Sequence, residues 1–271
     1  MKLHTNVEVF RSKLELISQK SNVPLSIVER DYWLTDILYN FSCHKLSNKL
    51  VVKGGCALKY FYGLIDREVY DVDFVSIEPV MTKDIRFMFD DIMYASHFST
   101  DEEHVLQHVR WYPYDHENLS QEIRMDYYKG ETVFEYCDKN YIGKCMSEIF
   151  KDTLLCDEYL IKDFSLTVMG INNIFVEKVL AFSDKYIRER YSEAEKHFSD
   201  VLVIFTSGML EEEKVKDLFC KKIEHDIQLF GNEKIERMLE FEVFLDDKFM
   251  DKYNKDKKVI EELVEFLRNV I

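Results

Sequence analysis

The fold is decided by residues 50–62, which read LVVKGGCALKYFY. A short β-branched run stops at two glycines and a helical pattern follows, so the stretch predicts a strand, a tight turn and a helix. Glycine tolerates positive φ and has no Cβ, so the main-chain N–H groups at Gly54 and Gly55 can approach an anion closely. The turn therefore predicts a site for phosphate oxygens.

A pair of carboxylates follows in residues 70–77, which read YDVDFVSI and predict a second strand. The period of two places Asp71 and Asp73 side by side on one face of that strand. Two carboxylates held there repel each other unless a cation lies between them, and oxygen ligands of this kind suit Mg²⁺. Alone, the glycines are typical of a plain turn and the aspartates of a solvated strand end, but together they indicate a metal and phosphate site.

A third carboxylate, Asp126, lies in residues 121–128, which read QEIRMDYY and alternate between polar and apolar as a strand does. Asp126 could complete a metal triad with Asp71 and Asp73. The alternative is an edge strand on which Arg124 and Asp126 point into water. The alternation fits both interpretations equally.

A lysine stands out in residues 171–186, which predict an amphipathic helix because apolar residues recur three and four apart. Lys178 falls on the apolar stripe, where a lysine needs a partner or a path to water. The partner could be a phosphate or an active-site aspartate, and the alternative is a lysine that snorkels at the stripe edge. On the next predicted helix, His197 shares a face with Asp200. His197 could be a base, a phosphate ligand or, as we favour from the sequence alone, a core histidine bonded to Asp200.

The order hydrophobic-Gly-Gly, Asp-hydrophobic-Asp and a later hydrophobic-Asp-hydrophobic strand resembles the polymerase-β-like nucleotidyltransferase superfamily. Within it, the chain is similar to the AbiEii/AbiGii family of toxins, which includes the MenT enzymes. Four further stretches carry this resemblance: residues 28–34 (VERDYWL), Arg67, residues 177–182 (EKVLAF) and residues 196–200 (KHFSD). The resemblance spans residues from about 24 to about 205.

The resemblance implies a toxin of type IV toxin-antitoxin and phage-defence systems, held in check by an antitoxin protein. Characterised members bind NTPs and transfer nucleotides, in some cases to the acceptor end of tRNA. The motif residues carried over are Gly54, Gly55, Asp71, Asp73, Lys178 and Asp200. Two positions depart from the pattern, since Val69 stands where the family usually has Ser and Val203 where it often has a second Asp. The first departure would alter phosphate contacts, and the second removes a carboxylate near the base or acceptor.

The predicted chemistry rests on positioning and charge neutralisation, which dominate catalysis of nucleotidyl transfer. One or two Mg²⁺ ions held by Asp71 and Asp73 would bridge the triphosphate oxygens of the NTP, with Asp126 as third ligand or base. The glycine turn would hold the triphosphate, and Lys178 would offset charge on the leaving pyrophosphate. The residues predicted to bind the nucleotide are Lys53, Gly54, Gly55, Arg67, His197 and Asp200. Lys59 could add a further phosphate contact, but a surface role is favoured for it, because the helix phase leaves it unconstrained.

Composition limits the cellular setting. Six cysteines are scattered without the paired spacing of a metal site, and the N-terminal residues do not have the pattern of a signal peptide. No apolar run approaches the roughly 20 residues of a membrane span. We therefore expect a cytoplasmic protein with reduced thiols and no membrane segment.

The formal net charge of -15 argues mildly against an RNA partner, because a nucleic-acid binder must neutralise phosphates. A local basic patch is conceivable in residues 185–197, but glutamates interleave with its cations, and a solvated helix face is favoured. An acidic surface fits a basic protein partner equally well.

The expected fold class is α+β. The resemblance implies a polymerase-β-like nucleotidyltransferase core with a mixed sheet, and we place this domain, with two N-terminal helices, in residues 1–165. One of its strands is predicted at residues 104–114. From residue 166 to residue 271 glycine and proline nearly vanish and apolar residues recur at helical spacing, which predicts a helical bundle domain.

Three functional classes fit these observations. The first is an NTP-dependent nucleotidyltransferase toxin. The second is a binding module that has kept the phosphate site but lost turnover, as Val69 and Val203 suggest. The third is a metal-dependent nuclease, since an aspartate pair with a third acid also serves two-metal hydrolysis. The glycine turn disfavours the nuclease, because hydrolysis of a phosphodiester has no triphosphate to hold.

Overall fold

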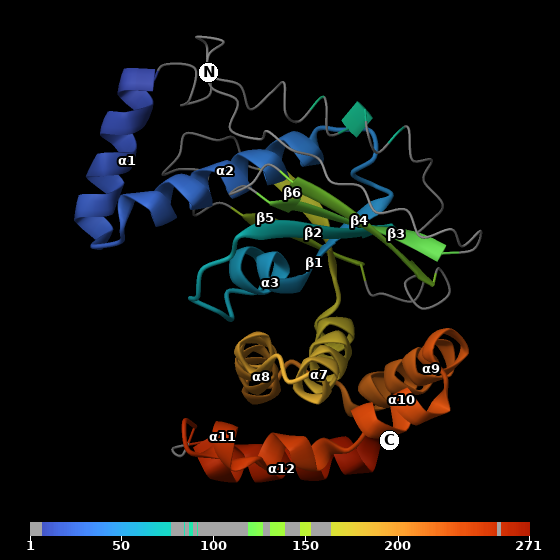
Figure 1. Cartoon of the computed structure of the whole chain (residues 1–271). Coiled ribbons are helices and arrows are strands. Elements are labelled where there is room, and N and C mark those ends of the chain that lie inside the picture. Colours follow the sequence, from blue (N-terminus) through green and yellow to red (C-terminus); the bar gives the residue numbers. More distant parts are fainter. Residues whose placement is uncertain are drawn as a thin grey trace. The chain divides into compact units, whose positions relative to one another are not determined.

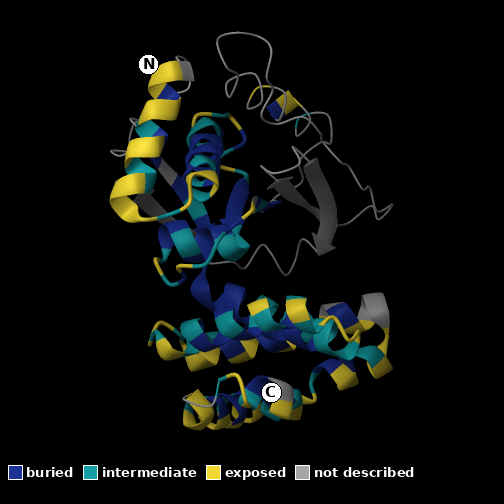
Figure 2. Ribbon diagram, turned by 60° about the vertical axis from the view of Figure 1, so that its left-hand side comes forward, coloured by how far each residue is buried: buried dark blue, intermediate teal, exposed yellow. Residues whose placement is uncertain are grey.

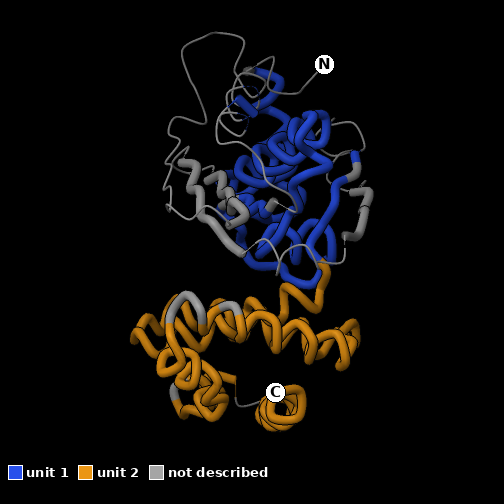
Figure 3. Tube along the Cα trace, turned by 90° about the vertical axis from the view of Figure 1, so that its right-hand side faces the viewer, with its two compact units in different colours: residues 1–169 blue, residues 170–271 orange. Residues whose placement is uncertain are grey.

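The computed structural model describes residues 7–76, 84, 87–88, 91, 119–126, 131–138, 147–152, 164–253 and 256–271. Positions 71, 119–126, 131–138 and 147–152 are described by their backbone and strand pairing. The strand predicted at 104–114 lies outside the described residues. The chain divides into two compact units, Met1–Met169 and Gly170–Ile271, which are coloured separately in Figure 3.

The first unit combines helices with strands and confirms the α+β class. Its helical elements are α1 (Val7–Ser21), α2 (Leu25–Ser42), α3 (Gly54–Cys56) and the π-helical η2 (Ala57–Phe61) (Figure 1). Its strands are β1 (Leu50–Lys53), β2 (Asp71–Ser76), β3 (Leu119–Asp126), β4 (Glu131–Asp138), β5 (Ser147–Asp152) and β6 (Phe164–Met169). The boundary predicted at residue 165 falls inside β6, because β6 completes the sheet before the helices of the second unit begin.

The strands of the first unit form one mixed sheet in the order β4-β3-β2-β1-β6-β5. β1 pairs parallel with β6 and antiparallel with β2, and the other neighbours are antiparallel. β1 lies in the interior of the sheet, which explains why its Leu50, Val51 and Val52 have no exposed surface. The glycine turn therefore follows directly from a buried interior strand, and β2, which carries Asp71 and Asp73, pairs with that same strand.

The core of the first unit forms where α2 packs on the sheet. Phe41 of α2 and Phe74 of β2 are fully buried, with their ring centroids 4.3 Å apart. Figure 2 shows the buried residues of this unit concentrated in α2 and the central strands. Val72 and Phe74 turn toward this core, so the alternate positions 71 and 73 belong to the other face of the strand.

The second unit is helical in its described residues. Its elements are α7 (Ile171–Ile187), α8 (Tyr191–Thr206), α9 (Glu212–Phe230), α10 (Asn232–Met238), the 3₁₀ helix η3 (Phe241–Leu245), α11 (Asp247–Met250) and α12 (Lys257–Val270). Phe182, Phe198 and Phe244 form an aromatic cluster in its core, with the Phe182 and Phe244 centroids 4.2 Å apart. In the part of the chain that the structure describes, no helix is both long and apolar enough to cross a bilayer.

Candidate functional site

The glycine turn after β1 brings the main chain against one of the predicted aspartates. Gly54 has φ of +68°, and a Cβ added to it would lie 2.8 Å from Oδ2 of Asp73. The pairing of β1 with β2, in which Lys53 lies opposite Asp73, produces this approach. Both the backbone conformation and the space require glycine at position 54, as the predicted positive φ implies, while the approach of this backbone to phosphate oxygens stays a prediction.

The second glycine is covered by an arginine. A Cβ added to Gly55 would lie 3.3 Å from Nη2 of Arg67, and 3.7 Å from Cγ2 of Val69. The Arg67 guanidinium also donates from Nη1 to the main-chain oxygen of Glu68 at 3.2 Å. A cation therefore lies over the start of the helix, while Val69 presents a methyl group near the place where the resemblance leads one to expect a hydroxyl.

The strand register aligns the predicted carboxylates. In the antiparallel pair of β2 with β3, Asp71 lies directly opposite Asp126, and Asp73 lies opposite Arg124. Residues directly opposite on neighbouring strands share a face, so positions 71, 73 and 126 belong to one face of the sheet. The edge-strand interpretation of Asp126 is wrong, because β3 lies between β2 and β4.

Two rows of charged positions cross this face of the sheet. One row contains Lys53, Asp73 and Arg124, so a basic residue stands on each side of Asp73. The other contains Asp71, Asp126 and Glu131 of β4. The register therefore places three acidic residues at adjacent positions of one face of the sheet.

The oxygen chemistry of this face suits Mg²⁺, which prefers carboxylates and water over nitrogen or sulfur ligands. Among the residues whose side chains are described, no three His, Cys, Asp or Glu gather as a metal-binding group. Two members of the predicted set, Asp71 and Asp126, are placed by their backbone alone. The fit of this face to Mg²⁺ therefore rests on the alignment of positions 71 and 126 beside Asp73, whose carboxylate lies at the glycine turn.

The remaining predicted residues lie in the second unit, on α7 and α8. Nζ of Lys178 is 2.7 Å from Oδ2 of Asp200, and the two side chains are 11% and 0% exposed. Lys178 on the apolar stripe thus has an aspartate as its partner and does not snorkel to water. His197 lies on α8 one turn before Asp200 and is half-buried. The sequence motif in this unit corresponds to a buried ion pair between two helices.

Three cations of the predicted basic patch, Lys185, Arg188 and Arg190, are engaged in ion pairs. Lys185 pairs with Glu193 at 2.8 Å, and Arg190 lies 3.8 Å from the same carboxylate. Arg188 pairs with Asp184 at 3.1 Å. These pairs fit the interpretation of a solvated helix face better than that of a phosphate-binding patch.

The structure corrects the interpretation of Lys59. Its Nζ donates to both carboxylate oxygens of Asp31, at 3.0 and 3.3 Å, and the hydroxyl of Tyr60 donates to Oδ1 of Asp31 at 2.7 Å. Lys59 is only 17% exposed, so it is not a simple surface residue. The helix phase was a poor guide because residues 57–61 are π-helical, and a π-helix does not follow the 3.6-residue period.

A second cluster beside the site was not predicted as functional. Nη1 of Arg30 and the hydroxyl of Tyr70 both donate to Oε2 of Glu68, at 2.6 and 2.7 Å. The Arg30 guanidinium also lies 4.1 Å from the centroid of the Tyr70 ring. The hydrogen bond from Tyr70, followed by that from Arg30, holds the pKa of Glu68 below its ordinary value. The available signal was the stretch 28–34, which contributed to the family resemblance but carried no assigned role.

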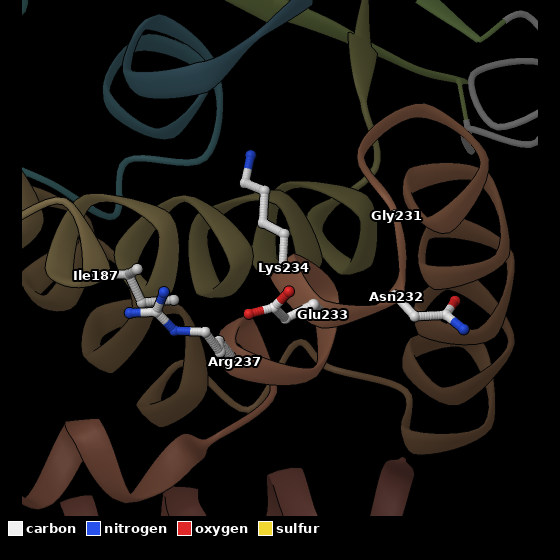
Figure 4. A pocket seen from close by; sticks show the side chains of 6 residues that line it. All are labelled: Ile187, Gly231, Asn232, Glu233, Lys234 and Arg237. Carbon is white, nitrogen blue, oxygen red and sulfur yellow. The ribbon is translucent and has the colours of Figure 1, made fainter.

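A hollow in the second unit contains none of the predicted residues. Its volume is about 360 Å³, and it is lined by Ile187, Gly231, Asn232, Glu233, Lys234 and Arg237 (Figure 4). Two of the lining residues, Lys234 and Arg237, are cationic. Lys234 pairs with Asp184 at 3.2 Å, so its charge is partly neutralised. We assign no chemistry to this hollow.

Comparison with known families places these features in context. The family model described as nucleotidyl transferase AbiEii toxin, type IV TA system, matches residues 36–267. The match confirms the resemblance predicted from the motifs and continues beyond residue 205, where the recognisable motifs end. Residues 28–34 lie outside it. Among curated proteins, none matches the sequence.

Proposed function

Because the chain belongs to the nucleotidyl transferase AbiEii toxin family of type IV toxin-antitoxin systems, we propose that it transfers a nucleotide from an NTP to a hydroxyl acceptor. The proposed site is the face of the sheet beside the glycine turn, within a polymerase-β-like core. The observation that carries this proposal is the approach of Asp73 to Gly54, at 2.8 Å from the position of a Cβ. A turn that only reversed the chain would not need to hold a carboxylate against its own backbone.

The proposed reaction is a displacement at the α-phosphorus of the NTP. The acceptor oxygen forms a bond to that phosphorus, the bond between the α-phosphorus and the oxygen bridging to the β-phosphorus breaks, and pyrophosphate leaves. The proton of the acceptor hydroxyl passes to a base, for which Asp126 is the candidate, because its position lies directly opposite Asp71. Such transfers depend chiefly on positioning and on neutralising charge.

We propose that Asp71 and Asp73, with Asp126, hold Mg²⁺. When bound, the ion supplies charge neutralisation on the triphosphate. The main chain at Gly54 and Gly55 would bind phosphate oxygens, and the Arg67 guanidinium over Gly55 would add positive charge to the same place. Lys53, opposite Asp73, is a further candidate for the triphosphate.

Lys178, His197 and Asp200 enter the proposal with one modification. The pairing of Lys178 with the buried Asp200 supports a role for Asp200 in holding the lysine. Of these three residues, Lys178 and His197 are therefore proposed to contact the nucleotide directly, and Asp200 is not. A lysine held by an aspartate is restricted in orientation, which suits a group that offsets charge on pyrophosphate. We further propose an RNA acceptor such as tRNA, a protein antitoxin as partner and a helical bundle architecture for residues 166–271.

One observation favours a second candidate function, a module that binds a nucleotide without turnover. Val69 is buried, with Cγ2 3.7 Å from the Cβ position of Gly55, where a serine hydroxyl would provide a polar contact. Loss of that contact would weaken phosphate positioning while leaving the glycine turn intact.

The test is incubation of the purified protein with each α-³²P-labelled NTP, Mg²⁺ and total tRNA, resolved on a denaturing gel beside Asp71→Asn. We expect label on RNA with one or more NTPs and none with the variant. Calorimetric titration with the same NTPs runs in parallel. Binding without label on RNA or protein would support the second candidate, and neither binding nor label would overturn both.

A further inference from the structure

The beginning of α2 contacts two separate segments that lead into the proposed site. Arg30 and Asp31 are neighbours in sequence, but their side chains reach different partners. Asp31 accepts hydrogen bonds from Lys59 and Tyr60 of η2, whereas Arg30 binds Glu68 and lies on Tyr70. Both contacts join residues far apart in the sequence, since Asp31 and Lys59 are 28 positions apart and Arg30 and Glu68 are 38 positions apart.

The Asp31 contact links α2 to the helical segment that begins at Gly54. η2 follows α3 without a break, so Lys59 and Tyr60 lie one to two turns after the glycines. Two donors from adjacent residues converge on one carboxylate, whose side chain is 18% exposed. A charge-assisted pair of this kind is stronger and more directional than an ordinary surface contact, so it restrains the axial position of the helix.

The Arg30 contact links α2 to the segment that contains Arg67 and leads into β2. The Arg30 side chain is 6% exposed and binds Glu68 at 2.6 Å, and the main-chain oxygen of Glu68 accepts from Arg67. Tyr70, the residue before Asp71, donates to the same Glu68 oxygen. The segment therefore makes two contacts with a single arginine, a charge-assisted hydrogen bond through Glu68 and a cation–π contact through Tyr70.

These two segments require accurate positioning for the proposed chemistry. A Cβ added to Gly54 would lie 2.8 Å from Oδ2 of Asp73, and a Cβ added to Gly55 would lie 3.3 Å from Nη2 of Arg67. A shift of the helix or of the Arg67 segment by a few tenths of an ångström would change both relationships. Transfer reactions lose on the order of a hundredfold in rate when reacting groups are misplaced by about 1 Å.

We propose that Arg30 and Asp31 are positioning residues of the nucleotide site, Asp31 acting through Lys59 and Tyr60 on the glycine turn, and Arg30 acting through Glu68 and Tyr70 on Arg67. This inference rests on the proposed function. Both residues precede residue 36, where the family match begins, so they extend the functional machinery beyond it.

The experiment compares Asp31→Asn with Asp226→Asn in the full chain. Asp226 pairs with Lys222 at 2.8 Å in the second unit, with side chains 6% and 19% exposed, so it provides a matched ion pair between residues that are not proposed to bind the nucleotide. Each protein is titrated calorimetrically with ATP, GTP, CTP and UTP in Mg²⁺ without acceptor, and KM and kcat for transfer are measured with total tRNA. Denaturant unfolding gives the stability of each.

We expect Asp31→Asn to weaken NTP binding and raise KM by roughly tenfold to a hundredfold, the size usual for residues that orient ligands. Asp226→Asn should lose comparable stability with KM unchanged. Tyr60→Phe removes one hydrogen bond and keeps the volume, so it tests the same contact if Asp31→Asn does not fold. Arg30→Lys should recover part of the kcat/KM lost in Arg30→Met.

Several results would overturn the inference. If the wild-type protein binds and transfers nucleotide but Asp31→Asn and Tyr60→Phe keep its KM and kcat, Asp31 does not position the site. If Asp226→Asn raises KM as much as Asp31→Asn does, the effect is one of general stability. If the wild-type protein neither binds nor transfers any NTP, the proposed function itself has failed, and this inference falls with it.

Discussion

Replacement of Gly54 by alanine tests two separate effects, the strain of the backbone and the close approach of the Asp73 carboxylate. Gly54 has φ of +68°, and its added Cβ would lie 2.8 Å from Oδ2 of Asp73. Gly63, also in the first unit, has φ of +63° with nothing within 4 Å of its added Cβ. Gly63→Ala is therefore a matched control that shares the strain of the backbone but lacks the close contact.

The expected magnitudes follow from these values. Left-handed backbone costs an L-residue about 1–2 kcal/mol, and the smaller unfolded-state entropy of alanine offsets about 0.4–1 kcal/mol of this. Both variants should thus lose on the order of 1 kcal/mol of unfolding free energy. In Gly54→Ala the Asp73 oxygen must also retreat by about 0.6 Å, the difference between 2.8 Å and the 3.4 Å of ordinary contact. A short side chain can turn away at little cost in stability, so the difference should appear in activity, as a loss of roughly tenfold or more.

The assay pairs urea unfolding with transfer from α-³²P-labelled NTP in Mg²⁺. We expect similar stability for the two alanine variants and a large loss of transfer for Gly54→Ala alone. Equal transfer by the two variants would refute the reasoning, because the contact between Asp73 and the turn would then have no catalytic consequence.

Three further predictions concern charge. Asp71→Asn should abolish transfer with far-ultraviolet circular dichroism unchanged, because it removes a carboxylate opposite Asp126 and relieves repulsion; an unfolded variant would show that the aspartates are structural. Lys178→Met should lower the unfolding free energy by about 3–5 kcal/mol, since it removes the cation facing the fully buried Asp200. In urea unfolding, the double variant Lys178→Met/Asp200→Leu should recover much of that loss. A Lys178→Met protein as stable as wild type would contradict this prediction. The hydrogen bond to Asp246 raises the pKa of Tyr186 from 10.0 to about 12, so the folded protein keeps a proton that the unfolded chain releases, and its contribution to stability declines as pH rises from 10 toward 12. Urea unfolding across this range should show a shallower decline for Tyr186→Phe, and an identical pH dependence would exclude the contribution.

Local patterns in the sequence were sufficient for the elements around the site. The β-branched run of residues 50–52 could be read as a strand, and the period of two placed Asp71 and Asp73 on one face. The polar position of Lys178 on an apolar stripe correctly indicated that its ammonium needs a partner. The sequence could not select that partner, because Asp200 lies on another helix and the choice depends on how α7 and α8 pack.

The contacts that the sequence did not predict are non-local or depend on unusual backbone geometry. The opposition of Asp71 and Asp126 follows from strand register, and a shift of one residue would have moved Asp126 to the other face. Lys59 was misinterpreted because a π-helical turn does not follow the 3.6-residue period of an α-helix, and because its partner Asp31 is 28 residues away. Neither relation leaves a periodic signal in the chain.

The charge distribution at the site reconciles an acidic protein with an anionic substrate. The net charge of -15 describes the whole surface, whereas a triphosphate responds mainly to charges within about 10 Å at moderate salt. At the glycine turn the cations are concentrated: Lys53 lies opposite Asp73 and the Arg67 guanidinium covers Gly55. The nearby acids at 71, 73 and 126 are the residues proposed to bind Mg²⁺, which would offset much of their negative charge and so reduce their repulsion of a nucleotide. The net charge therefore bears on recognition of the proposed acceptor and antitoxin, and the local charges bear on the proposed binding of an NTP.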